Sequence, residues 1–202
     1  MRRPLAAAVA LALACAACSP RPSRFFTLAP QPMPAEATIH PTGVLGLGPV
    51  DIPAYLDRTA IVTRVSDAEV RLSGRDVWSE PLHSAVTRLL AADLQAALGS
   101  ERVVLYPWDV AAAPPVAVAV DVLQFEKQPG PEVLLVARWR VGVPRQPARL
   151  LRETTCREPL AGEHPDTPAV VDAMSRCVAQ LAGEIASAVR DVAPGRAGSV
   201  AR

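Results

Sequence analysis

The chain is organised around residues 49–108, which read PVDIPAYLDRTAIVTRVSDAEVRLSGRDVWSEPLHSAVTRLLAADLQAALGSERVVLYPW. The stretch opens with a Pro-bracketed loop, continues into short β-prone runs, and then changes to the spacing of an amphipathic helix. It closes with the strand-like run Val103–Tyr106, which Pro107 stops. This one stretch therefore contains the element types of a mixed α and β fold.

A helix is predicted between Ser79 and Gly99, because the apolar residues there recur at intervals of three and four. Its apolar stripe consists of Leu82, Val86, Leu89, Leu90, Leu94, Ala97 and Leu98. Ser79 is the predicted N-terminal cap, Pro81 stands in the first turn, and Gly99 is the predicted C-terminal cap. His83 falls off the stripe, which favours a solvated side chain over a metal ligand.

The loop Asp51–Thr59 precedes a predicted hairpin formed by Ile61–Val65 and Glu69–Leu72. Tyr55 and Leu56 make this loop more apolar than a solvated loop requires. Two interpretations are open: these side chains fold back onto the sheet, or they contact another subunit or a partner protein. The candidate contact residues are Tyr55, Leu56, Asp57 and Arg58.

The rest of the chain predicts further strands and a second helix. The further strands are Phe25–Leu28, Val44–Val50, Val116–Phe125, Glu132–Val143 and Leu150–Cys156. The second helix is predicted from Thr167 or Pro168 to Val192. Its apolar stripe consists of Val170, Met174, Cys177, Val178, Leu181, Ile185 and Val189.

These elements predict an α+β fold: a single domain with one mostly antiparallel sheet of about six or seven strands, packed by two amphipathic helices. The domain is predicted over residues 44–193, followed by a disordered tail over residues 194–202. Half of the residues are apolar, which is enough for a hydrophobic core. The net charge of +1 lacks the basic excess that is typical of nucleic-acid binding, so no nucleic-acid partner is expected.

The N-terminus is typical of a secretory signal, because basic Arg2-Arg3 precedes the uncharged run Leu5–Ala17. Residues 1–17 are therefore predicted to be a lipoprotein signal peptide, too short to span a bilayer. Cys18 follows small residues, which resembles the lipobox of bacterial lipoproteins, in which the Cys thiol is acylated. The alternative is an ordinary signal peptide with an incidental Cys. Ser19 resembles a signal for outer-membrane sorting, and residues 18–43 form a predicted Pro-rich tether.

Cys156 and Cys177 would remain in the oxidising periplasm after signal cleavage. They enclose a loop of about twenty residues, for which a disulfide would contribute about 3 kcal/mol of stability. The alternative is two buried free thiols that pack as small apolar groups. The Cys spacing and the scattered His residues argue against a metal site.

The sequence contains no Gly-x-Ser-x-Gly elbow and no dinucleotide fingerprint around Gly46 and Gly48. This favours a protein that is not an enzyme and needs no cofactor. Arg residues are dense at positions 138, 140, 145, 149 and 152. They form either a solvated rim of the sheet or a surface for an anionic lipid or an acidic partner.

The motifs of the mature chain resemble the PqiC-type (YmbA-like) family of ABC-type transport auxiliary lipoproteins. They are Cys18, Phe25-Phe26-Thr27-Leu28, residues 48–58, Ile61-Val62-Thr63-Arg64, Trp78-Ser79-Glu80-Pro81-Leu82, Arg102-Val103, Tyr106-Pro107-Trp108, the strand around Phe125 and Ala137-Arg138-Trp139. The chain departs from the family pattern at Cys15, where the lipobox usually has Leu, and in its Cys156 and Cys177 pair.

The resemblance implies a periplasm-facing outer-membrane lipoprotein that docks with an MCE-domain protein, assembles as a homo-oligomer and serves lipid transport between membranes and envelope integrity. Its contact with membrane lipid would be the acyl anchor. Two rival hypotheses are a lipid-anchored periplasmic hydrolase or lipid-modifying enzyme, and a monomeric lipoprotein that binds a lipid. A nucleophile and a base within hydrogen-bond reach would favour the enzyme, and an enclosed apolar pocket would favour the lipid binder.

Overall fold

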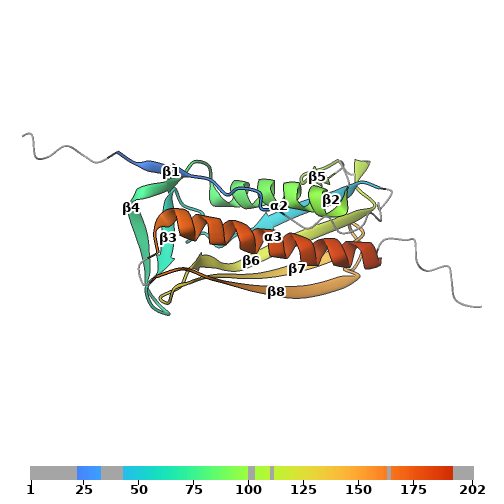
Figure 1. Cartoon of the computed structure of the whole chain (residues 1–202). Helices are drawn as coiled ribbons and strands as arrows, with labels where there is room; N and C mark the ends of the chain where they lie inside the picture. The colour runs from blue at the N-terminus through green and yellow to red at the C-terminus, as the bar shows by residue number, and fades with distance from the viewer. Residues whose placement is uncertain (1–21, 33–42, 100–102, 110–111, 163–164, 193–202) are drawn as a thin grey trace, which may run out of the picture.

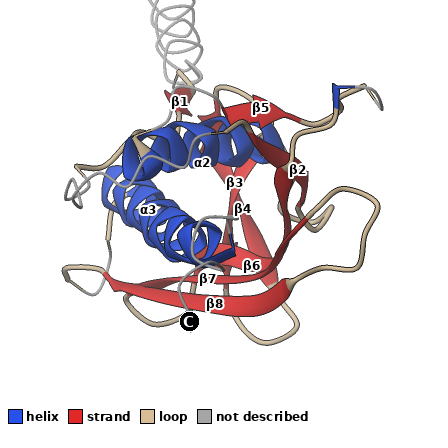
Figure 2. Cartoon of the chain, turned by 90° about the vertical axis from the view of Figure 1, so that its right-hand side faces the viewer, coloured by secondary structure: helices blue, strands red, loops and turns tan. Residues whose placement is uncertain are grey.

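The structure is a computed structural model that describes residues 22–32, 43–99, 103–109, 112–162 and 165–192. In these residues two helices lie against one mixed sheet, which curls around them (Figures 1 and 2). This arrangement confirms the predicted single α+β domain. The predicted signal peptide, Cys18 and the C-terminal tail lie outside the described residues.

The sheet has eight strands in the described part of the chain, against the six or seven predicted from the sequence. They are β1 (Arg24–Phe26), β2 (Leu45–Asp51), β3 (Ala60–Arg64), β4 (Val70–Trp78), β5 (Val103–Leu105), β6 (Val116–Lys127), β7 (Glu132–Gly142) and β8 (Leu150–Pro159). The helices are α2 (Leu82–Leu98) and α3 (Thr167–Val192).

The sheet follows the order β1-β4-β3-β6-β2-β5, and β7 and β8 extend it from the other side of β6. The pairs β3–β4, β6–β7 and β7–β8 are antiparallel, and the last two form the longest ladders. Parallel pairing joins β1 to β4, β3 to β6, and β2 to both β5 and β6. The strands β1, β5 and β8 therefore end the sheet.

The core lies between the helices and the inner face of the sheet. Alternation along β6 and β7 directs one set of residues inward: Val116, Val118, Val120, Val122, Val133, Leu135, Ala137, Trp139 and Val141 are all buried. The predicted stripe of α3 is buried along its whole length. The Trp139 indole N–H donates to Thr154 Oγ1 at 2.8 Å, so the largest core side chain has its one polar group satisfied.

The strand predicted over Val44–Val50 is present as β2, with a change of register between Leu47 and Val50. Two other local predictions were wrong in their boundaries. β4 runs on to Trp78, beyond the predicted end at Leu72. Pro81, rather than Ser79, is the residue before α2, while Gly99 caps the C-terminus in the predicted left-handed conformation.

Residues 22–32, part of the predicted tether, pack on the domain. β1 is an edge strand, as the sequence predicts for the run around Phe25 and Phe26. Leu28 is buried in the core, and the Ala29 N–H donates to Ser175 Oγ on α3 at 3.2 Å. The described N-terminal segment is therefore part of the folded unit.

Cys156 and Cys177 form a disulfide in the structure. The S–S distance is 2.05 Å and the two Cα atoms lie 5.5 Å apart. Both residues are buried, and the bond joins the edge strand β8 to the middle of α3. Of the two open interpretations, the structure therefore has the bridge.

Candidate functional site

The outer face of the sheet, which points away from the helices, contains a hollow beside the ends of β2, β6 and β7. Its floor includes Ala117 and Ala119 of β6, which alternate with the buried valines of that strand. Where the inward positions of β6 carry valine, these two outward positions carry only a methyl group. The strand therefore leaves space above its outer face.

One wall of the hollow is the aromatic segment after β5. Trp108 and Tyr106 lie edge to face, with ring centroids 5.3 Å apart. A Cβ on Gly46 would come within 2.9 Å of Trp108 Cη2, and one on Gly48 would come within 2.6 Å of Tyr106 Cβ. Gly48 also has a φ of 124°, so both its conformation and the close approach require glycine. Two missing side chains on β2 thus let the aromatic wall lie against the strand.

The opposite wall is the loop of residues 143–149, which joins β7 to β8. A Cβ on Gly142 would lie 3.2 Å from Ala148 Cα, so glycine again allows the loop to approach closely. Arg145 in this loop has a φ of 69°, a left-handed conformation that is uncommon outside glycine. Arg140 projects from the outer face of β7, opposite Ala119.

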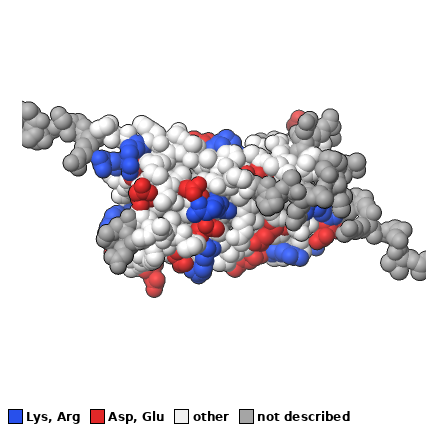
Figure 3. Space-filling view, viewed as in Figure 1, with Lys and Arg blue, Asp and Glu red and all other residues white. Residues whose placement is uncertain are grey.

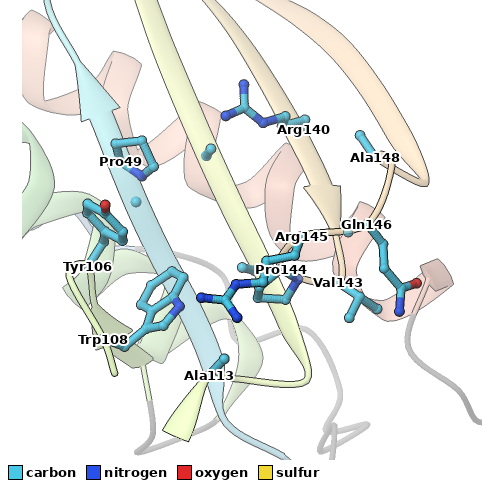
Figure 4. A pocket seen from close by; sticks show the side chains of 14 residues that line it. Pro49, Tyr106, Trp108, Ala113, Arg140, Val143, Pro144, Arg145, Gln146 and Ala148 are labelled. Carbon is cyan, nitrogen blue, oxygen red and sulfur yellow. The ribbon is translucent and has the colours of Figure 1, made fainter. Parts of the chain in front are cut away.

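These walls enclose a hollow of about 490 Å³ that is half open to solvent. Figure 4 shows Tyr106 and Trp108 on the β2 side, and the side chains of Arg140 and Arg145 extending from the β7 side over β6. The volume falls in the range of small-ligand sites, about 300–1,000 Å³. The hollow is thus lined by methyl groups and aromatic rings on one part and by cations on another.

The two arginines of the hollow have no ion-pair partner in the described part of the chain. Elsewhere on the sheet, Arg138 pairs with Glu153 at 2.9 Å and Arg157 pairs with Glu132 at 2.8 Å. Acidic and basic side chains also lie side by side on the face shown in Figure 3. On α3, Arg176 contacts Glu158 at 2.7 Å. Of the five arginines that the sequence singles out, only Arg140 and Arg145 line the hollow.

A second exposed feature, which we call the apolar edge, consists of Val104, Leu105 and Tyr106 at the β5 end of the sheet. Tyr106 is 54% exposed and Leu105 is 47% exposed. The Tyr106 N–H donates to Leu47 O at 2.9 Å, which extends the pairing of β5 with β2. β5 has β2 on only one side, so its outer edge is open among the described strands. An open edge with apolar side chains is a surface suited to protein contact.

The loop that the sequence marks for partner contact is largely packed on the domain. Leu56 is 1% exposed and belongs to the core, so its assignment as a contact residue is wrong; its side chain contributes to folding. The Tyr55 hydroxyl donates to Glu126 Oε2 at 3.1 Å and accepts from Arg64 Nη2 at 3.1 Å. Asp57 and Arg58 remain exposed.

Glu126 is the centre of a buried ion pair beneath this loop. Its side chain is fully buried and accepts a hydrogen bond from Arg64 Nε at 2.6 Å and another from the Phe125 N–H at 2.8 Å. The hydrogen bond to Glu126 raises the pKa of Arg64, and burial raises the pKa of Tyr55. The network fixes the loop to β3 and β6, a structural role rather than a free binding surface.

Asp57, His83 and Ser84 lie in hydrogen-bond reach of one another at the start of α2. His83 Nδ1 is 3.0 Å from Asp57 Oδ2, and His83 Nε2 is 3.2 Å from Ser84 Oγ. This is the order of a Ser-His-Asp relay. However, the N–H groups of Ser84 and Ala85 both donate to Pro81 O, so neither is free to stabilise an oxyanion. Sequence reasoning missed the cluster because Asp57 is 26 positions upstream of His83.

The described residues contain no cluster of three or more His, Cys, Asp or Glu side chains that could hold a metal ion. None of the described helices combines the length and apolarity needed to cross a membrane. The hollow and the apolar edge are also not predicted from the sequence, although Ala117, Ala119 and Gly142 are small residues within predicted strands. Their effect depends on which loops lie over them.

These features define a single-domain α+β protein with an open sheet edge and a half-open cationic hollow. The chain belongs to the family of ABC-type transport auxiliary lipoprotein components, whose sequence profile matches residues 26–186. This membership confirms the resemblance found in the motifs, and it makes the chain an envelope lipoprotein that serves transport as an auxiliary component. A comparison with curated proteins finds no match.

Solved structures support the same fold. Protein XCC0632 from Xanthomonas campestris, of the DUF330 family, superposes with a TM-score of 0.69 at 16% identity, over 81% of this chain and 93% of that one. A second structure, described only as an uncharacterized protein, has a TM-score of 0.63 at 18% identity, over 84% of this chain and 99% of that one. At these identities the similarity concerns the fold alone.

Proposed function

We propose that the chain is an outer-membrane lipoprotein that acts as a non-catalytic docking component of an MCE-type lipid transport system. An acylated Cys18 anchors it, and the folded domain faces the periplasm. It assembles as a homo-oligomer and contacts an MCE-domain protein of the same system. The role is to hold the transport path together, and so to maintain envelope integrity.

The observation that supports a docking role most directly is the apolar edge. Val104 and Leu105 lie on β5, and Tyr106 directly follows it; this strand has a neighbour on only one side among the described strands, and all three side chains are exposed. Apolar groups of this size contribute to association when they are removed from water, at about 25 cal/mol for each Å². Family membership over residues 26–186 supports transport as the process that this contact serves.

A pull-down from membranes, combined with size analysis, tests the proposal. The variant Leu105→Glu should weaken recovery of the MCE-domain partner or of the oligomer. Leu72→Glu is the matched control, because Leu72 is also 47% exposed but lies on β4, near the other end of the sheet. A native chain that is monomeric and recovers no MCE-domain protein would contradict the proposal.

The anchor is tested separately. The variant Cys18→Ala should move the protein from the detergent phase to the aqueous phase, because the acyl chains supply the membrane affinity. Continued partitioning into detergent would rule out acylation at Cys18. Fractionation of inner and outer membranes then tests the sorting that Ser19 suggests.

The contacts among Asp57, His83 and Ser84 favour a second candidate, a lipid-anchored serine hydrolase. Labelling with a fluorophosphonate probe separates it from the docking role. The docking proposal expects no label on Ser84, because the adjacent N–H groups are already bonded to Pro81 O. Label that is lost in Ser84→Ala, but kept in the control Ser79→Ala, would establish the hydrolase instead.

A further inference from the structure

We propose that the hollow on the outer face of the sheet binds an anionic amphiphile, a molecule with a phosphate or carboxylate head and an apolar chain. The head would lie between Arg140 and Arg145, and the first part of the chain would lie on the alanine floor. This inference goes beyond the docking role, which requires the apolar edge but no small ligand.

The cationic part of the hollow would bind the anionic head of the ligand. Arg140 and Arg145 line one cavity, and neither has a hydrogen-bond or ion-pair partner in the described part of the chain. The outer-face aspartate nearest in the β6 ladder, Asp121, stands opposite Arg138, which also pairs with Glu153. Guanidinium groups recognise phosphate and carboxylate through paired N–H donors. The hollow therefore offers two uncompensated cations to an anion.

The apolar part of the hollow would contact the apolar chain of the ligand. Ala117 and Ala119 form the floor, and Tyr106 and Trp108 form a wall, so a bare inorganic anion would leave most of the surface unused. Leu151, which is 70% exposed, stands opposite Arg140 in the ladder of β7 and β8. It adds apolar surface beside the cations, where a chain can leave the hollow. The combination of cations and apolar surface fits an amphiphile.

The shape of the hollow favours a small molecule over a protein segment. It is a local depression of about 490 Å³, closed at two sides by the aromatic wall and by the loop of residues 143–149. Small-ligand sites have this size and combine apolar lining with a few polar groups that fix orientation. An acidic peptide is therefore the alternative ligand, and the experiment must distinguish it from an anionic amphiphile.

Native mass spectrometry of the full chain, released from the neutral detergent dodecyl maltoside, tests the proposal. The probes are lysophosphatidylglycerol, zwitterionic lysophosphatidylcholine, inorganic phosphate and a hexaglutamate peptide. We expect lysophosphatidylglycerol to bind about tenfold more tightly than the other three, which corresponds to about 1.4 kcal/mol. Equal binding of lysophosphatidylcholine would overturn the role of the cations, and equal binding of phosphate or hexaglutamate would overturn the role of the chain.

Two sets of variants locate the site. The double variant Arg140→Gln, Arg145→Gln should lose about tenfold in affinity for lysophosphatidylglycerol. The control Arg75→Gln, Arg152→Gln removes the same charge from exposed positions outside the hollow and should bind normally. Ala119→Leu fills the floor without a change in charge and should also weaken binding. Equal affinities in the double variant and its control, with unchanged thermal unfolding, would overturn the site.

Discussion

The carboxylate of Asp57 caps α2 from a preceding loop: its Oδ1 accepts a hydrogen bond from the His83 N–H at 3.2 Å. No side chain of the helix itself or of Pro81 does this. The sequence predicts the cap at Ser79, but the Ser79 N–H donates to Phe26 O and holds β1 instead. Asp57, a candidate for contact with a partner, therefore makes a hydrogen bond within the fold.

The first prediction concerns this cap. Asp57→Ala should lower the free energy of unfolding by about 1 kcal/mol, because an N–H of the first turn loses its acceptor. Arg58→Ala is the control, since Arg58 is the adjacent exposed residue and its only bond among the described residues, from its backbone N–H to Leu56 O, does not involve the side chain. Urea unfolding followed by circular dichroism measures both. Equal effects of the two substitutions would contradict the capping role.

The second prediction concerns Leu56. Leu56→Ala should cost about 2–5 kcal/mol, because it leaves a cavity in the core. Tyr55→Phe should cost only about 1 kcal/mol, since it removes one hydroxyl from the network around Glu126. If Leu56→Ala instead leaves thermal unfolding unchanged and disrupts assembly, the loop is an interface, and the core role of Leu56 is contradicted.

A feature of the fold or of the hollow can be predicted from the sequence when residues of a single helix or strand determine it, but not when contacts between distant segments determine it. The α3 stripe follows from spacing along one element, so it is confirmed. The hollow depends on absent side chains at Gly46 and Gly142, and its walls are loops that only the tertiary fold brings there. The same holds for the cap of α2, because Asp57 reaches His83 only once the loop has folded against the helix.

The third prediction concerns pH and Asp93, a buried residue of α2 whose Oδ2 has no hydrogen-bond partner among the described residues. Burial raises its pKa to about 6. The pKa of an aspartate in the unfolded chain is about 4. Below about pH 4 the carboxyl group of Asp93 is protonated in both states and burial of its charge costs no stability; the protein loses stability as pH rises from about 4 to about 6. Asp93→Asn should therefore gain about 1–2 kcal/mol near pH 8 and nothing near pH 4.

Thermal unfolding of Asp93→Asn across this pH range is the measurement. Asp191→Asn is the control, because Asp191 is an exposed aspartate on the other helix. A gain at pH 8 that persists unchanged at about pH 4 would show that titration of Asp93 is not its cause.

The fourth prediction concerns Asp76, which holds β1 and the start of α3 together. Arg24 donates to both of its carboxylate oxygens at 2.7 Å, and Thr167 donates to Oδ2. These bonds lower the pKa of Asp76 to about 2, the bond from Arg24 being the strongest cause. Its contribution to stability is therefore full above about pH 4 and is lost as pH falls toward about 2.

Asp76→Asn should expose the β1 segment without unfolding the domain, because Arg24 is half exposed and a solvent-exposed ion pair contributes little to stability. Hydrogen exchange of residues 22–32 should become faster in this variant. Asp67→Asn, in the exposed turn between β3 and β4, is the control and should leave that exchange unchanged. Slow exchange in Asp76→Asn would mean that Leu28 and the β1–β4 pairing suffice to hold the segment.

The last prediction concerns the bond between Cys156 and Cys177, which the family resemblance does not account for. It closes a loop of 21 residues, for which chain entropy gives about 3 kcal/mol of stabilisation. Reduction should lower the thermal midpoint of the native chain but not of a Cys156→Ala, Cys177→Ala double variant, which lacks the bond in both conditions. Peptide mapping without reductant should recover the cross-linked pair. If reduction leaves the native midpoint unchanged, the bond adds no stability, and the two Sγ atoms serve only to fill the space between β8 and α3.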